Sequence, residues 1–141
     1  MKYWDASAIV PMITRQAFTD SMEQRLIQDS EMITWWASSV ECYSALMRLV
    51  REGKLDANQQ HLAEQRLSSL QNGWEEVMPT ETVRRIAKRL LRTHLLRAAD
   101  ALQLAAALTA CEQDPDRFEF VCLDSRLAEA ARREGFVTPG N

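Results

Sequence analysis

The chain of 141 residues contains 46% hydrophobic and 26% charged residues, which is ordinary for a water-soluble protein of one domain. Its net charge of -3 excludes the overall positive charge by which many proteins hold nucleic acids. A polyanionic substrate would therefore need a local basic patch or a bound metal ion.

Short apolar runs alternate with helical patterns along the whole chain. They predict strands at 2–4, 32–36, 74–78, 119–123 and 136–138, and helices after Asp5 and at 19–28, 38–52, 56–73, 81–94, 98–110 and 125–133. Strands that alternate with helices are typical of a parallel sheet covered on both faces. We therefore expect one three-layer α/β/α domain over residues 1–141, with a mostly parallel, five-stranded sheet.

The expected helix starts carry recognisable signals. Ser38 and Glu41 have the S-x-x-E spacing of a capping box, and Asp124 can cap the last helix. Ser7 can cap the turn after the first strand. In the helix that follows Ser38, we expect Val40 and Tyr43 to face inward. Segment 98–110 is apolar nearly all round, which predicts a central, buried helix.

The sequence also indicates where the protein works. The start MKYWDASAIVPM lacks the basic flank and long apolar run of a signal peptide. No segment approaches the ~18 uninterrupted apolar residues that a membrane helix needs. Three cysteines without a CxxC pair are typical of reduced thiols. We expect a cytoplasmic protein with no membrane partner.

Four acidic residues lie where the pattern turns from strand to helix or opens a helix: Asp5, Glu41, Asp100 and Asp124. In open parallel sheets, ligands gather beyond the carboxyl ends of the strands, where Asp5 and Asp124 are expected. Each acid alone also has a structural explanation, because acids are favoured in first helical turns. That explanation is weakest for Asp100, which lies among alanines and a leucine in the apolar helix.

Clustered carboxylates suit one kind of chemistry in particular. Mg²⁺ and Mn²⁺ prefer carboxylate and water oxygens. One or two such ions can activate water and neutralise the charge of a phosphodiester during hydrolysis. The sequence contains no GxxxxGK[ST] loop, GxGxxG motif or Ser-His-Asp set, so acyl-transfer, P-loop and dinucleotide chemistry lack their residues.

Four ordered blocks of the sequence resemble those of a known family. The blocks YWDASAIVPM, ASSVECYSALMR, LRAADALQLAAAL and VCLDSRLAEAARREGF are similar to the motifs of PIN-domain proteins, above all the VapC-type toxins of bacterial toxin–antitoxin pairs. The resemblance implies a ribonuclease that depends on Mg²⁺ or Mn²⁺ and has a five-stranded parallel sheet. It also implies a homodimer that a cognate antitoxin protein silences.

The resemblance assigns roles to individual residues. Asp5, Glu41 and Asp100 match the metal-binding acids of the family. Asp124 matches its more variable fourth acid, which acts through water or on a second ion. Two hydroxyls support them: Ser7 matches a position of the first block, and Ser125 stands beside Asp124. The family often has a hydroxyl directly after its first acid, where this chain has Ala6, so Ser7 alone would orient Asp5.

Six of the 17 basic residues lie close together: Arg84, Arg85, Lys88, Arg89, Arg92 and Arg97. They form either the solvated face of a helix or a strip that contacts RNA phosphates. Nearby, His94 is expected to pack at the end of its helix.

Two other functions stay open, a PIN-like interaction module without catalysis and a receiver-like signalling domain. The second lacks the adjacent acidic pair and the final lysine that such domains need.

Overall fold

The computed structural model describes residues 2–14, 31–116 and 118–139. Its strands are β1 (Lys2–Trp4), β2 (Met32–Trp35), β3 (Glu75–Val77) and β4 (Glu119–Val121). Its helices are α1 (Ala6–Thr14), α3 (Ser38–Arg51), α4 (Ala57–Gly73), α5 (Glu81–Thr93), α6 (Ala98–Ala110) and α7 (Ser125–Arg133). The helix predicted at 19–28 lies outside the described residues.

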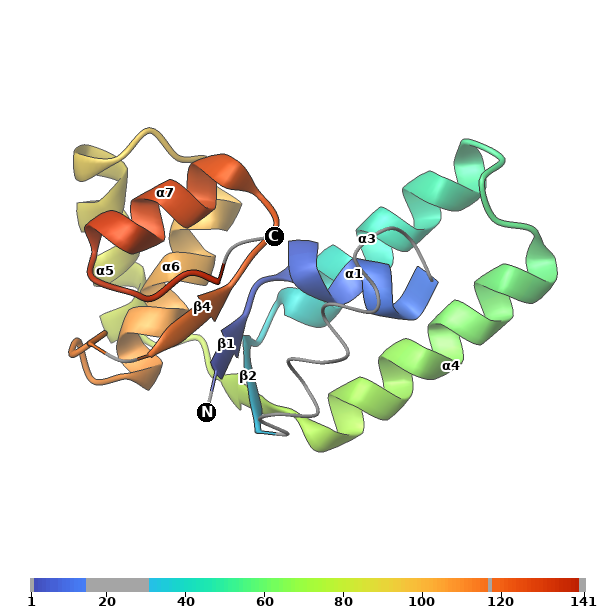
Figure 1. Ribbon diagram of the computed structural model, residues 1–141, viewed down its shortest axis with the longest axis horizontal. Helices are drawn as coiled ribbons and strands as arrows, with labels where there is room; N and C mark the ends of the chain where they lie inside the picture. The colour runs from blue at the N-terminus through green and yellow to red at the C-terminus, as the bar shows by residue number, and fades with distance from the viewer. Residues whose placement is uncertain (1, 15–30, 117, 140–141) are drawn as a thin grey trace.

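The strands form one parallel sheet in the order β3-β2-β1-β4. Helices α1, α3 and α4 lie on one side of it and α5, α6 and α7 on the other (Figure 1). This arrangement confirms the predicted three-layer sandwich. Because all paired strands run in the same direction, the carboxyl ends of β1, β2 and β4 meet at one edge of the sheet, which we call the carboxyl edge.

The alternation of side chains along the strands explains the two cores. Tyr3 and Phe120, whose rings stack with their centres 5.2 Å apart, belong to the core beneath α5, α6 and α7. Their neighbours in sequence, Trp4 and Val121, point the other way into the core beneath α1, α3 and α4. Both sheet faces are therefore apolar, as the runs of hydrophobic residues in the sequence indicate.

The sheet has four strands rather than five in the described part of the chain. At the predicted fifth strand, only Val137 forms a bridge, to Glu119 of β4. The backbone of Val137 accepts a hydrogen bond from Phe120 N and donates one to Phe118 O. Pro139 follows two residues later and has no N–H with which to extend the pairing.

The predicted caps at two helix starts were wrong. Ser38 lies inside the first turn of α3 and makes no cap; its Oγ accepts a hydrogen bond from Trp35 N at 3.1 Å. At α1, the carboxylate of Asp5 accepts a hydrogen bond from Ser7 N at 3.1 Å, so Asp5 takes the place predicted for Ser7. Asp124 caps α7 as predicted.

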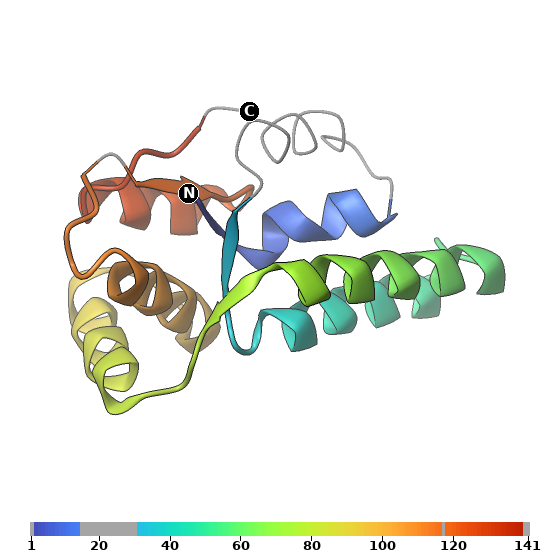
Figure 2. The same cartoon turned by 90° about the horizontal axis from the view of Figure 1, so that it is seen from below.

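Helices α3 and α4 run side by side and extend beyond the sheet (Figure 2). The prediction that Val40 and Tyr43 face the core was wrong, since these side chains are 65% and 44% exposed. Instead they line a groove between α3 and α4, with a volume of about 500 Å³. Among the described helices, none is long and apolar enough to cross a membrane.

Candidate metal centre

Asp5 lies at the middle of the carboxyl edge, directly after β1. Its backbone N–H donates to Val121 O at 2.9 Å, which continues the pairing of β1 with β4. The side chain is buried, and no basic side chain among the described residues pairs with it. Burial raises the pKa of Asp5, the hydrogen bonds from Ser7 lower it, and the charge of Asp100 raises it further.

Ser7 and Cys122 fix the position of Asp5. The hydroxyl of Ser7 accepts a hydrogen bond from Leu123 N at 2.9 Å and contacts Cys122 Sγ at 3.6 Å. The thiol of Cys122 in turn lies 3.6 Å from Asp5 Oδ2. Ser7 therefore ties the start of α1 to the end of β4. The sequence indicated Ser7 but gave no sign that Cys122 lies beside Asp5.

Glu41 reaches the same edge from the first turn of α3. Its Oε2 accepts a hydrogen bond from Gln103 Nε2 at 2.6 Å. The pKa of Glu41 is raised to about 7. Burial is the main cause, the charges of Asp5 and Asp100 add to it, and the hydrogen bond from Gln103 opposes it. A glutamate with this pKa and no basic partner among the described residues is poorly satisfied as it stands.

Gln103 of α6 is the residue that the sequence interpretation missed. It is fully buried, and its Nε2 also donates to Ser38 Oγ at 3.1 Å. Its Oε1 accepts a hydrogen bond from the hydroxyl of Tyr3. Gln103 thus joins β1, α3 and α6 beneath Glu41. The available signal was a long polar side chain inside the apolar run of segment 98–110, because a buried amide requires partners.

Asp100 and Asp124 complete the edge from α6 and α7. Asp100 is half-buried in the first turn of α6; burial and the charge of Asp124 raise its pKa, and the charges of Arg97 and Arg126 lower it. Asp124 is exposed, and its Oδ1 accepts hydrogen bonds from Arg126 N at 3.0 Å and Leu127 N at 3.1 Å. Ser125 is exposed next to it.

The four acids interact electrostatically as one group. The charge of Asp100 raises the pKa of both Asp5 and Glu41. The charge of Asp124 in turn raises the pKa of Asp100. Within residues 2–14, 31–116 and 118–139, no three carboxylate, imidazole or thiol side chains are placed closely enough to hold an ion as they stand. The carboxylates would have to move toward one another for metal binding.

The chemistry of this group nevertheless fits a divalent cation. Its members are oxygen donors, which Mg²⁺ and Mn²⁺ prefer. They repel one another, and neither Asp5 nor Glu41 has a basic partner in the described chain. A divalent cation would relieve that repulsion. Acids that only cap helices would not need such an ion.

The basic strip is only partly available for RNA. Arg84 pairs with Glu81 at 2.9 Å, and Arg89 pairs with Glu134 at 3.0 Å. His94 Nε2 lies 2.6 Å from the same carboxylate of Glu134, which places His94 in a contact between α5 and α7. Arg97 is the member of the strip whose charge acts on the acidic group.

A comparison with known families finds one that spans nearly the whole chain. The PIN domain matches residues 2–132, from β1 to the last turn of α7, and thus includes all four acids. No curated protein matches the chain.

Proposed function

Because the chain belongs to the PIN domain family, we propose that it is a ribonuclease that depends on Mg²⁺ or Mn²⁺. PIN domains are generally nucleases and usually use divalent metals. The single observation that supports this function best is the group of four mutually repelling carboxylates at the carboxyl edge, two of them without a basic partner in the described residues.

In this proposal, Asp5, Glu41 and Asp100 hold the ion. The ion supplies charge neutralisation at the scissile phosphate and makes water more acidic. Asp124, exposed at the rim, orients the attacking water or helps to hold a second ion. Ser7 and Cys122 hold the side chain of Asp5, and Gln103 holds that of Glu41, so both acids stay at the carboxyl edge where the ion would bind.

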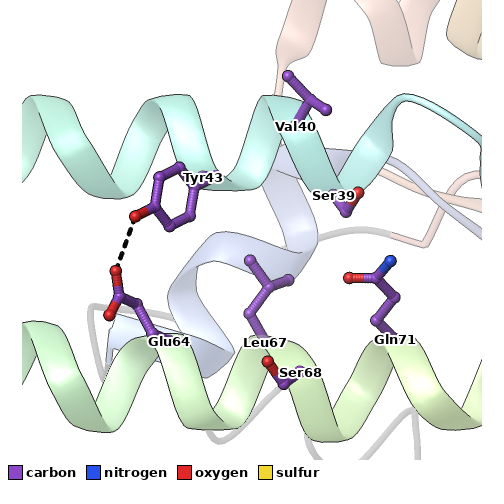
Figure 3. Close-up of a pocket in the computed structure, with 7 residues that line it drawn as sticks. All are labelled: Ser39, Val40, Tyr43, Glu64, Leu67, Ser68 and Gln71. Atoms are coloured by element: carbon purple, nitrogen blue, oxygen red, sulfur yellow. Dashed lines mark hydrogen bonds between the residues drawn. The ribbon is translucent and has the colours of Figure 1, made fainter.

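We further propose that the protein is the toxin of a toxin–antitoxin pair, with the whole of residues 1–141 as one domain and a homodimer as its assembly. The support is the resemblance of its four sequence blocks to VapC-type toxins. The groove between α3 and α4 offers a place for a segment of an antitoxin (Figure 3). Exposed Val40 lies at one end of it, next to Glu41, and Tyr43 donates a hydrogen bond to Glu64 across it at 2.9 Å.

The test is cleavage of a single-stranded RNA by the purified protein with Mn²⁺. We expect Asp100→Asn to lower cleavage by more than about 100-fold, because substitution of residues that only support metal ligands already costs about 10–100-fold. Its unfolding temperature should stay unchanged or rise, since the pKa of Asp100 is raised in the folded protein. A chelator should abolish cleavage by the unaltered protein.

Asp56→Asn is the matched control. Asp56 caps α4 with a hydrogen bond from Gln59 N, and asparagine can keep that bond, so cleavage should be unaffected. Full activity of purified Asp100→Asn in chelator would refute the proposed function. A folded protein that neither binds Mn²⁺ nor cleaves RNA would instead be the interaction module.

A further inference from the structure

A small pocket adjoins the carboxyl edge between α7 and the connection from α5 to α6. Its volume is about 180 Å³. His94 and Leu95 line it from the connection, and Arg126, Glu129 and Arg133 line it from α7. The pocket shares no lining residue with the groove between α3 and α4, two helices that lie on the other side of the sheet (Figure 1).

Arg126 belongs both to this pocket and to the acidic group. It lies in the first turn of α7, and its backbone N–H donates to Asp124 Oδ1 at 3.0 Å. Its side chain is exposed, and its charge acts on Asp100. Arg97, the N-cap residue of α6, stands three residues before Asp100 and acts on it in the same way. The charges of two arginines from different helix starts therefore act on Asp100.

These two arginines differ from those whose charge a carboxylate already neutralises. The arginines with ion pairs in the described residues are Arg84, Arg89, Arg132 and Arg133. Neither Arg97 nor Arg126 forms an ion pair with any residue that the structure describes. An incoming anion can therefore bind them without first displacing a carboxylate, and a guanidinium binds phosphate oxygens in a bidentate manner.

The pocket adds an apolar surface next to Arg126. Leu95 is 80% exposed on the turn between α5 and α6, and Ala130 of α7 lies in the same lining. Glu129 holds Arg133 at 3.2 Å and Arg132 at 2.8 Å, so its charge is already balanced. An exposed leucine beside an arginine that has no ion pair in the described residues suits an unpaired nucleobase whose phosphate lies at the arginine.

We propose that Arg126 and Arg97 bind the RNA phosphate next to the scissile one, and that the pocket at Leu95 receives the unpaired base of the same nucleotide. This inference rests on the proposed function and deepens it. In this arrangement, a single-stranded RNA runs from the carboxyl edge over the start of α7 and does not contact the outer face of α5.

The test measures binding of a fluorescently labelled, single-stranded RNA by anisotropy in the Asp100→Asn protein, which prevents cleavage. With Arg126→Ala added, we expect the affinity to fall by about 5- to 50-fold and the slope of log affinity against log salt to fall by about 0.7, as for one lost phosphate contact to a single strand. Leu95→Ser should weaken binding without changing that slope, because it removes no charge. Arg51→Ala, at the far end of α3, is the matched control and should bind like its parent.

Unchanged binding by Arg126→Ala, with weaker binding by Arg85→Ala on the outer face of α5, would overturn the inference. So would an Asp100→Asn protein that binds no RNA. Unfolding temperatures of all variants show that each is folded. Cleavage by the unaltered protein, measured in parallel, reports on the proposed function separately. If the unaltered protein cleaves RNA but Arg126→Ala binds RNA with unchanged affinity, only the inference is refuted.

Discussion

Burial of carboxylates without basic partners is costly, and a protein retains it only where the surroundings compensate. At Asp5, the compensation in the described residues comes from Ser7 and from the weak thiol donor of Cys122. At Glu41, it is one amide donor from Gln103. Both acids are thus held in position but not neutralised, which is the state expected of ligands for a cation.

Glu41 should make the stability of the metal-free protein depend on pH. Its pKa is about 7 in the folded protein against 4.5 for the ordinary side chain. Between these values the folded state holds a proton that the unfolded chain has lost, so stability falls as pH rises through this window. We expect Glu41→Gln to raise the unfolding temperature clearly at pH 8 and much less at pH 5.

Thermal unfolding followed by circular dichroism in chelator tests this expectation. Glutamine keeps the size of the side chain and an oxygen that can accept the Gln103 hydrogen bond, so only the charge differs. An equal rise in unfolding temperature at both pH values would contradict the assignment, since a gain from packing does not depend on pH.

The acids could be predicted from the sequence because each interrupts an apolar or small-residue stretch at a helix start. Their partners could not. Gln103 lies 62 residues from Glu41 and Cys122 lies 117 residues from Asp5, and local patterns carry no information on such contacts. Arg126 was missed because it is not near the basic strip in sequence, whereas in the folded chain Arg97 and Arg126 act on Asp100 from the starts of two different helices.

At the scale of elements, several helices begin at the carboxyl edge, and among them α3, α6 and α7 carry Glu41, Asp100 and Asp124 in or directly before their first turns. Acids in these turns gain from the helix dipoles, which makes a structural role for each credible. Asp124 is the case in which the two roles can be separated, because its carboxylate caps α7 through Oδ1.

We expect Asp124→Ala and Asp124→Asn to lower RNA cleavage alike, by about 10-fold or more, if the charge matters as that of a residue supporting the metal. Only Asp124→Ala should also destabilise the fold, by about 1 kcal/mol, because asparagine keeps the capping acceptor. Chemical denaturation and initial cleavage rates measure the two effects. If Asp124→Asn cleaved RNA as fast as the unaltered protein, Asp124 would have no role beyond capping α7.

Most element positions could be predicted from the sequence, and the failures have physical reasons. The boundaries of α6 and α7 were predicted correctly, since apolar periodicity and Gly135, with its positive φ of 106°, define them locally. The capping box at Ser38 failed because contacts with Trp35 and Gln103 replaced it. The fifth strand failed because Pro139 cannot extend the pairing.

At the scale of the whole molecule, the parallel sheet explains why residues as distant in sequence as Asp5 and Asp124 lie at one edge of the sheet. Apolar side chains on both sheet faces fix the helices in two layers, one on each side of the sheet (Figure 1). The fold class followed from the alternation of strands and helices in the sequence. The position of the four acids along that edge depends on the strand order β3-β2-β1-β4, which the sequence pattern does not reveal.

Titration of the chelator-treated protein with Mn²⁺ in a calorimeter tests most directly whether this edge is a metal site. We expect saturable binding by the unaltered protein, a rise in unfolding temperature with Mn²⁺ concentration, and the loss of both in Asp5→Asn. Asp56→Asn should bind like the unaltered protein. Equal Mn²⁺ binding by Asp5→Asn and the unaltered protein, or no binding by either, would contradict the assignment of the four acids.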